Sequence, residues 1–208
     1  PGSQIVDNAA DFLSQEGTKN DYAFQSGLIQ ATYGYDNKYN FQASFRVDGA
    51  SRFGKNNRYG AFYSVSGAWN IHNEGFFNIN ALNLLRLKAS YGEVGNVPNS
   101  LYASYSLYNL NAQYNGQPAA IPGQYQNLDV SWERSRDANI GLEIGAWNRL
   151  NLTVEAYNEN TNGLLYSVAF PATAGWSNQW ENVGAIRNKG LELALNADIF
   201  PNENPFQW

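Results

Sequence analysis

The chain has 208 residues, and its composition excludes several classes of protein before any motif is considered. It contains no cysteine, which excludes a disulfide framework or a thiolate metal site, and its net charge of −5 gives no support to nucleic-acid binding. Charged residues make up 15% and aromatic residues also 15%, which favours β-structure over a solvated helical protein. No apolar run approaches the roughly 18 residues of a membrane-spanning helix, whereas a barrel strand needs only about ten alternating residues.

Alternating apolar and polar residues predict about seven strands of similar length. Residues 1–22 are polar and indicate a loop, after which the alternation begins. The expected strands cover residues 23–35, 39–48, 61–71, 84–92, 138–146, 150–157 and 191–198. No segment predicts a convincing helix. Because the chain contains no methionine, we expect it to be an interior piece of a longer protein.

The expected strand at residues 39–48 alternates without an error and shows what the faces of the sheet contain. One face carries Phe41, Phe45 and Val47, and the other carries Gln42, Ser44 and Arg46. In a soluble sandwich the apolar face would be the core. In a membrane barrel it would meet lipid, and the polar face would line a lumen.

The lengths of the connections favour the barrel. Short connections at residues 36–38, 73–82 and 147–149 alternate with long ones at 49–59, 93–129 and 159–187. Antiparallel up-and-down strands therefore have every short turn at one end and every long loop at the other. Outer-membrane barrels show this asymmetry, with long loops outside the cell. We predict that residues 1–208 form part of an all-β, antiparallel, up-and-down transmembrane β-barrel.

Two weaker features agree with this fold. Aromatic residues lie beside the short turns, as an interfacial aromatic ring would require: Tyr33, Tyr35, Tyr39, Trp147 and Phe200. The polar face carries charges that a lumen would hydrate or pair: Arg46, Arg86, Lys88, Glu143 and Glu155. The outside of a soluble sandwich would carry similar charges, so this second feature discriminates poorly.

Several stretches resemble a known family. The segment YDNKYNFQASFRVDGASRFGKNNRYGAFYSVSGAWNI is similar to a strand-loop-strand segment of the SusC/RagA-type TonB-dependent transporters of Bacteroidetes outer membranes, and DGASRFG with KNNRYG is its most specific part. Three later stretches fit the same family in the same order: LNLLRLKASYGEVGN, WNRLNLTVEAYNENTNGLL and ENVGAIRNKGLELALNA. The resemblance covers about residues 35–198.

The resemblance implies a barrel of about 22 strands closed by an N-terminal plug that lies outside this chain. It implies import of a large nutrient ligand, a glycan or a peptide, across the outer membrane of a Gram-negative bacterium. Its implied partners are TonB, acting through the plug, a SusD-like surface lipoprotein that acts as a lid, and outer-membrane lipid. This chain would supply barrel wall and ligand-facing loops.

The long loops hold the candidate ligand-binding residues. Aromatic rings stack on sugars or peptide side chains, and neighbouring amides supply hydrogen bonds. The candidates for ligand or lid contact are Tyr102, Tyr105, Tyr108, Tyr114, Tyr125, Trp176 and Trp180. Arg52, Lys55 and Arg58 are candidates for contact with lipopolysaccharide phosphates at the outer rim. The plainer interpretation is that the aromatics pack the loops and that the cations are solvated or internally paired.

The sequence offers little for catalysis. His72 is the only histidine, which excludes a metal site built from several histidines, and no catalytic, metal-binding or cofactor-binding residue is predicted. Glu133, Asp137, Glu143 and Glu155 are better explained as strand-borne charges than as paired glycosidase carboxylates. The alternatives to active import are a secreted β-sandwich that binds glycan and a passive porin or structural barrel.

Overall fold

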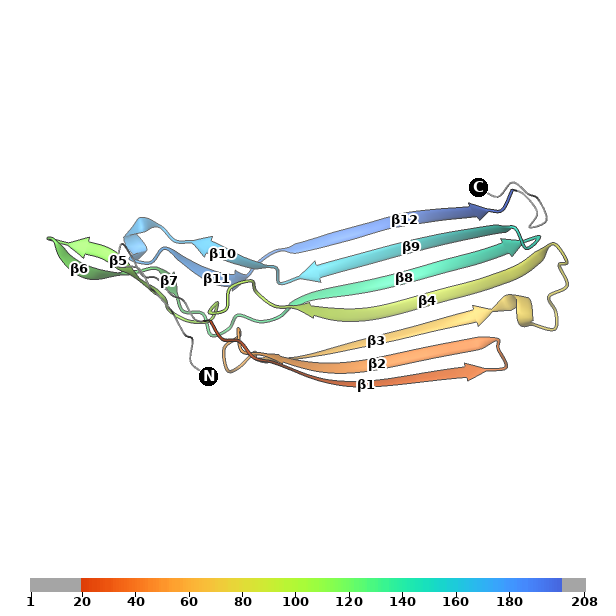
Figure 1. The fold of residues 1–208 in the computed structure, drawn as a ribbon, viewed down its shortest axis with the longest axis horizontal. Coiled ribbons are helices and arrows are strands. Elements are labelled where there is room, and N and C mark those ends of the chain that lie inside the picture. Colours follow the sequence, from red (N-terminus) through yellow and green to blue (C-terminus); the bar gives the residue numbers. More distant parts are fainter. Residues whose placement is uncertain (1–19, 200–208) are drawn as a thin grey trace, which may run out of the picture.

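The computed structural model describes residues 20–199, and a single layer of seven long strands dominates it (Figure 1). The strands are β1 (Phe24–Tyr35), β2 (Tyr39–Ala50), β3 (Tyr59–Asn70), β4 (Leu82–Asn96), β8 (Glu133–Ala146), β9 (Leu150–Asn162) and β12 (Ala185–Ala197). They are adjacent in the order β1-β2-β3-β4-β8-β9-β12, and each neighbouring pair is antiparallel. The predicted all-β, up-and-down fold is confirmed, and it leaves no second large sheet, within residues 20–199, to form a sandwich.

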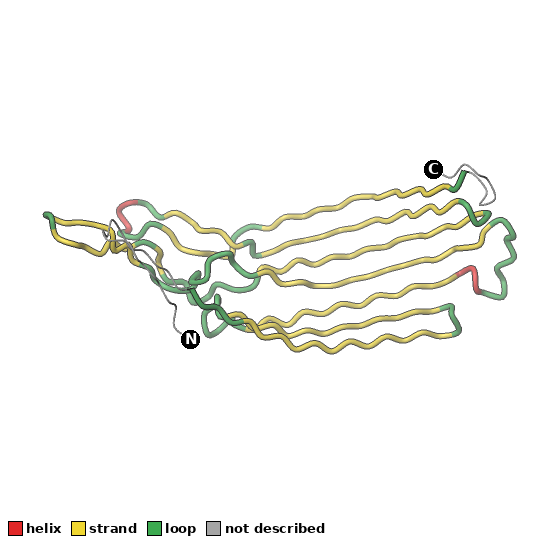
Figure 2. Tube along the Cα trace, viewed as in Figure 1, coloured by secondary structure: helices red, strands yellow, loops and turns green. Residues whose placement is uncertain are grey.

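The short connections lie together at one end of this sheet (Figure 2). The β1–β2 turn has positive φ at Asp36 and Asn37, and the β8–β9 turn has positive φ at Trp147 and Asn148. Two successive residues with positive φ are characteristic of the tight turns that match the twist of a β-hairpin. The third connection on this side contains the 3-10 helix η1 (Ile71–Asn73).

The long connections at the other end are more ordered than the sequence suggested. They contain β5 (Tyr108–Tyr114), β6 (Gln117–Pro122), β7 (Gln124–Tyr125), β10 (Leu165–Ala169), the 3-10 helix η2 (Ala172–Ala174) and β11 (Asn178–Asn182). The β5–β6 hairpin turns at Asn115-Gly116, where both residues have positive φ. The Asn-Gly pair is a strong hairpin signal that the expectation of irregular loops overlooked.

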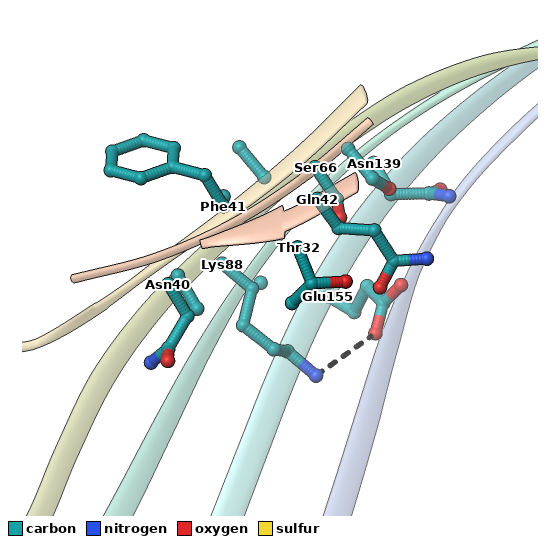
Figure 3. A pocket seen from close by; sticks show the side chains of 13 residues that line it. Thr32, Asn40, Phe41, Gln42, Ser66, Lys88, Asn139 and Glu155 are labelled. Atoms are coloured by element: carbon teal, nitrogen blue, oxygen red, sulfur yellow. Dashed lines mark ion pairs between the residues drawn. The ribbon is translucent and has the colours of Figure 1, made fainter. Parts of the chain in front are cut away.

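The polar face of the sheet is concave. A single hollow on it is lined by residues from β1, β2, β3, β4, β8 and β9, which requires the sheet to curve toward that face. Figure 3 shows Thr32, Gln42, Lys88 and Glu155 gathered on the hollow side, whereas Phe41 points away from them. The predicted division between Phe41 and Gln42 is therefore confirmed, and the polar face has the curvature of a barrel lumen.

The opposite, convex face carries large apolar side chains that no other part of the described chain covers. Ile29 is 74% exposed, Phe41 is 54% exposed and Leu193 is 68% exposed. A protein surrounded by water rarely exposes a continuous apolar sheet face of this kind. A lipid environment removes the free-energy cost of exposing apolar surface to water, because these side chains then contact acyl chains.

The buried apolar cluster lies where the long loops meet the sheet. Its members are Ala50, Phe53, Phe62, Ala103, Val130 and Trp132. Trp132 is central, with its ring centroid 4.8 Å from that of Phe53 and 5.4 Å from that of Phe62. Within residues 20–199, no helix is long and apolar enough to cross a membrane.

Candidate functional site

The stretch DGASRFG, residues 48–54, forms a clamp between the sheet and the loops. Asp48, at the end of β2, is buried, and it accepts a hydrogen bond from Ser26 Oγ at 2.8 Å and pairs with Arg46 Nε at 2.7 Å. The Phe53 side chain is fully buried against Trp132. Asp48 and Phe53 therefore have a structural role in this stretch.

The same clamp, together with Asn57 of the β2–β3 loop, holds the β4–β8 loop, residues 97–132. Arg52 Nη1 donates to the Pro98 carbonyl oxygen at 2.7 Å, and Asn57 Nδ2 donates to the Asp129 carbonyl oxygen at 2.9 Å. A Cβ atom at Gly54 would lie 2.6 Å from the Leu128 carbonyl oxygen. A glycine is needed there because the backbone of the other loop approaches too closely for any side chain.

Charged side chains pair across the polar face. Lys88 Nζ lies 2.8 Å from Glu143 and 4.0 Å from Glu155, and Arg86 Nη1 lies 3.3 Å from Glu143. Arg86 Nε also donates to Asn70 Oδ1 at 2.6 Å. Adjacent strands place these residues side by side, so the charges neutralise each other within a hydrated surface. This arrangement suits a lumen lining better than a catalytic pair of carboxylates.

Three of the predicted aromatic residues come together in the long loops. The Trp176 ring centroid lies 5.4 Å from that of Tyr108 and 5.2 Å from that of Tyr125. Tyr125 also contacts Phe170 edge to face, with a centroid separation of 6.3 Å. Tyr108 and Tyr125 stay 56% and 44% exposed, so the cluster presents ring surface outward. We call these four residues the aromatic loop cluster.

The other predicted aromatic residues lie elsewhere. Tyr102 and Tyr105 contact each other edge to face at 6.5 Å, Tyr114 stands 81% exposed near the tip of the β5–β6 hairpin, and Trp180 packs against the buried cluster. Gln124 organises this region from within. Its Nε2 group donates to the carbonyl oxygens of Tyr102 and Tyr105, both at 2.8 Å.

Sequence reasoning singled out neither Phe170 nor Gln124. Phe170 is an isolated aromatic residue in its segment, and Gln124 is one glutamine in a loop rich in amides. Their positions follow from the parallel pairing of β7 with β11, which joins two loops far apart in the sequence. That pairing leaves no periodic pattern from which either residue could have been predicted.

The three candidate cations of the β2–β3 loop have different surroundings. Arg52 is half-buried, donates to a backbone carbonyl and lies 5.3 Å from the Tyr22 ring centroid. Lys55 and Arg58 are exposed. Arg52 is thus held by the Pro98 carbonyl and the Tyr22 ring, whereas the side chains of Lys55 and Arg58 are exposed on the surface of the loop. His72, in η1, has its Nδ1 atom 3.1 Å from the Leu85 carbonyl oxygen.

The comparison with protein families decides the identity of this fold. The model for the beta-barrel of TonB dependent receptor-like proteins matches residues 1–208. The chain belongs to this family. The strand order, the sorted connections and the apolar outer face are thus those of a segment of a TonB-dependent receptor barrel.

Individual relatives confirm the resemblance to SusC/RagA-type transporters. TonB-dependent receptor P39 of Formosa agariphila is 35% identical over 209 residues, covering 99% of this chain and 20% of the relative. TonB-dependent receptor SusC of Bacteroides thetaiotaomicron is 32% identical over 203 residues, covering 90% of this chain and 20% of SusC. The chain spans about a fifth of the length of both relatives.

Solved structures agree with the sequence relatives. The RagAB peptide importer in its closed-closed state matches with a TM-score of 0.80 and 37% identity, covering 88% of this chain and 20% of the matched chain. The open-open state of RagAB matches with a TM-score of 0.78. The siderophore receptor PirA of Pseudomonas aeruginosa, at 16% identity and a TM-score of 0.56, shares the fold.

Proposed function

We propose that this chain is part of an outer-membrane receptor that imports a large nutrient ligand with energy supplied through TonB. The match of residues 1–208 to the TonB-dependent receptor barrel is the observation that carries the proposal. In this function, a plug outside the chain closes the lumen and contacts TonB. A SusD-like surface lipoprotein covers the extracellular opening and captures the ligand. The receptor is a transporter with no enzymatic step.

The described residues contribute three parts to this function. The convex apolar face contacts lipid, and the concave polar face lines the lumen, where Lys88 and Glu143 pair beside the ligand path. The long loops lie at the extracellular end. The clamp at residues 48–54 holds the loops against the rim, so that ligand contacts made by the loops are positioned relative to the lumen.

The ligand is a glycan or a peptide, and the aromatic loop cluster is the candidate contact. Trp176 with Tyr108 and Tyr125 provides ring faces of the kind that stack on sugar rings or on peptide side chains. RagAB, which is 37% identical over the matched region, is described as a peptide importer, and this supports a peptide as the first ligand to test. Glycan, the other ligand class that the family resemblance implies, is the second.

Uptake by cells tests the proposal. The full-length receptor gene is deleted, and uptake of labelled peptide mixtures and of oligosaccharides is compared with and without TonB. We expect one ligand class to lose uptake both when the receptor is deleted and when TonB is deleted. Uptake through the receptor that persists without TonB would instead identify a passive porin.

The same assay locates the ligand contact. Trp176→Ala removes the ring shared by Tyr108 and Tyr125, and we expect it to lower the apparent affinity for the transported ligand about tenfold, the size of a lost aromatic stacking contact. Tyr166→Ala, at an exposed tyrosine of β10 that is not a candidate contact, is the matched control and should transport as the unmodified receptor does. Equal effects of the two substitutions would argue against the aromatic loop cluster as the contact.

A further inference from the structure

The apolar face ends in basic residues on two of the last three strands of the sheet, β8 and β12. Along β12, Leu195, Leu193 and Leu191 share this face, and the next two positions on it toward the long loops are Lys189 and Arg187. The change from leucine to cation occurs within a single step of the alternation. An interior or solvated strand has no reason to change so abruptly.

The two neighbouring strands also change at nearly the same level, β9 to asparagine and β8 to arginine. On β8 the convex face changes from Ile140 and Ala138 to Arg136 and Arg134. The register places Arg136 opposite Asn160 of β9, which in turn lies opposite Arg187 of β12, so these residues form one row across three strands. We call four residues of this region the basic band: Arg134, Arg136, Arg187 and Lys189.

The last apolar residue lies farther along β2 than along β12. Strands that are tilted in a barrel require such an offset, because the edge of the lipid-facing surface is perpendicular to the barrel axis and not to the strands. Following the register, Tyr39 of β2 lies in one row with Leu193 of β12. The apolar face ends at Val47 on β2, eight residues beyond that row, and at Leu191 on β12, two residues beyond it. The difference of six residues corresponds to about 20 Å along the strand direction. The two strands are separated by five strand spacings of about 4.8 Å across the sheet. The corresponding angle of about 40° agrees with the strand tilt of membrane barrels.

The basic band is therefore a level edge of the lipid-facing surface and not an accident of strand length. Within it, Glu93 of β4 accepts hydrogen bonds from Arg134 and, at 2.8 Å, from Arg136 Nε. Glu93 is the acidic residue at this edge, because the convex-face positions of β8, β9 and β12, all of them within the described chain, contain none. Four cations thus stand against one carboxylate.

Two of the cations have no ion-pair partner among residues 20–199. Arg187 and Lys189 are exposed, and neither forms an ion pair with another residue of the described chain. Arg187 Nε donates to Asn158 Oδ1 at 2.7 Å, which holds the guanidinium along the sheet surface and uses only one of its five N–H donors. The remaining donors suit the oxygens of a phosphate group.

We propose that the basic band binds the phosphorylated head group of a lipid in the outer leaflet, with its acyl chains lying on the leucines of β12. The inference rests on the proposed outer-membrane placement, which puts the long-loop end outside the cell. The apolar rows and the cations directly above them match the two chemical parts of a phospholipid or phosphoglycolipid. This site differs from Arg52, Lys55 and Arg58, which belong to the β2–β3 loop and not to the face of a strand.

Binding of lipid A to the purified full-length receptor tests the site. The receptor in neutral detergent is titrated with bisphosphorylated lipid A, with dephosphorylated lipid A and with inorganic phosphate, and binding is followed by native mass spectrometry. The test variant is Arg187→Gln with Lys189→Gln, which leaves the Glu93 pairs intact. The control is Lys55→Gln with Arg58→Gln, which removes the same charge from the rival phosphate candidates in the β2–β3 loop.

We expect bisphosphorylated lipid A to bind far more tightly than the dephosphorylated form. The test variant should lose about thirtyfold in affinity, since each basic residue near an anionic lipid surface contributes roughly fivefold, and the control should change less than twofold. Equal binding of the two lipids by the unmodified receptor, or equal losses in test and control variants, would overturn the proposal. Competition by millimolar inorganic phosphate alone would identify a free-anion site instead.

The comparison of the two lipids requires no substitution, so it holds even where a variant folds poorly. Transport is measured separately. Selective lipid binding by a receptor that shows no TonB-dependent uptake would contradict the proposed function and support the lipid site. TonB-dependent uptake by a receptor that shows no selective lipid binding would support the proposed function and contradict the lipid site.

Discussion

The two ends of the seven-stranded sheet are held by contacts of different range. At the short-turn end, Tyr39 Oη and Trp69 Nε1 both donate to Glu74 Oε1, at 2.6 and 2.9 Å, and the two rings stack with a centroid separation of 6.3 Å. At the long-loop end, Asn57 binds the backbone of Asp129, 72 residues away. The Tyr39–Glu74 contact spans 35 residues and the Asn57–Asp129 contact spans 72, so the second contact joins parts of the chain that lie farther apart in the sequence.

This difference separates the wall from the loops that we propose contact the ligand. Tight turns and the hydrogen bonds to Glu74 are sufficient to hold the end of the sheet where the chain only reverses its direction. Where loops must be positioned over a lumen, the protein adds a buried aromatic cluster and close backbone contacts. The predictions below disturb one end at a time in the full-length receptor.

The largest effect is expected at the centre of the loop clamp. Trp132→Ala removes a 4% exposed indole that contacts Phe24, Phe53 and Phe62, and truncating a buried aromatic of this size costs about 3–5 kcal/mol. We expect residues 97–132 to become sensitive to protease on intact cells. The barrel should stay folded in semi-native gel electrophoresis, because the strand pairs do not depend on Trp132.

Tyr114→Ala is the control, since that side chain is 81% exposed at the hairpin tip and its loss should change neither measurement. Collapse of the whole barrel in Trp132→Ala would mean that wall and clamp form a single cooperative unit, which would break the distinction between the two ends.

A smaller effect is expected from a matched pair of glycines. Gly54→Ala places a Cβ atom 2.6 Å from a backbone oxygen of Leu128, whereas Gly27→Ala places one in open space. Overpacking against backbone costs about 1–3 kcal/mol, so Gly54→Ala should expose the β4–β8 loop to protease at a lower temperature. Gly27→Ala should be neutral, and comparable shifts in the two variants would refute the close approach of the loops.

The smallest effect is expected at the short-turn end and depends on pH. Hydrogen bonds from Tyr39 and Trp69 lower the pKa of Glu74 below its ordinary value. The sign follows from this direction: the stabilisation is complete above the unfolded carboxyl pKa of about 4.3 and is lost as the pH falls through the lower folded value.

Glu74→Gln should therefore lower the unfolding temperature of the receptor slightly at pH 7, and the difference from the unmodified receptor should vanish in strong acid. The measurement is the temperature at which the folded gel band disappears at each pH. A difference between the two proteins that is constant across pH would show that the Glu74 charge is not what closes this end.

The period-two alternation was sufficient to predict the wall. It placed Phe41 and Gln42 on opposite faces, and the sorted connection lengths predicted which end carries the loops. Both are local properties, because a strand reverses its side chains at every residue and a turn is determined by its own few residues. Lys88 and Glu143 were assigned to the polar face for the same reason, although their ion pair depends on how β4 and β8 align.

The loop residues could not be assigned in the same way. Trp176 was predicted as a ligand contact together with Trp180, but only Trp176 joins the aromatic loop cluster, because the pairing of β11 with β7 turns the two side chains toward different neighbours. The sequence determined the alternation, the turns and the family motif. The tertiary structure alone decided which loops meet, because contacts such as Gly54 with Leu128 join residues far apart in the chain and leave no periodic trace in it.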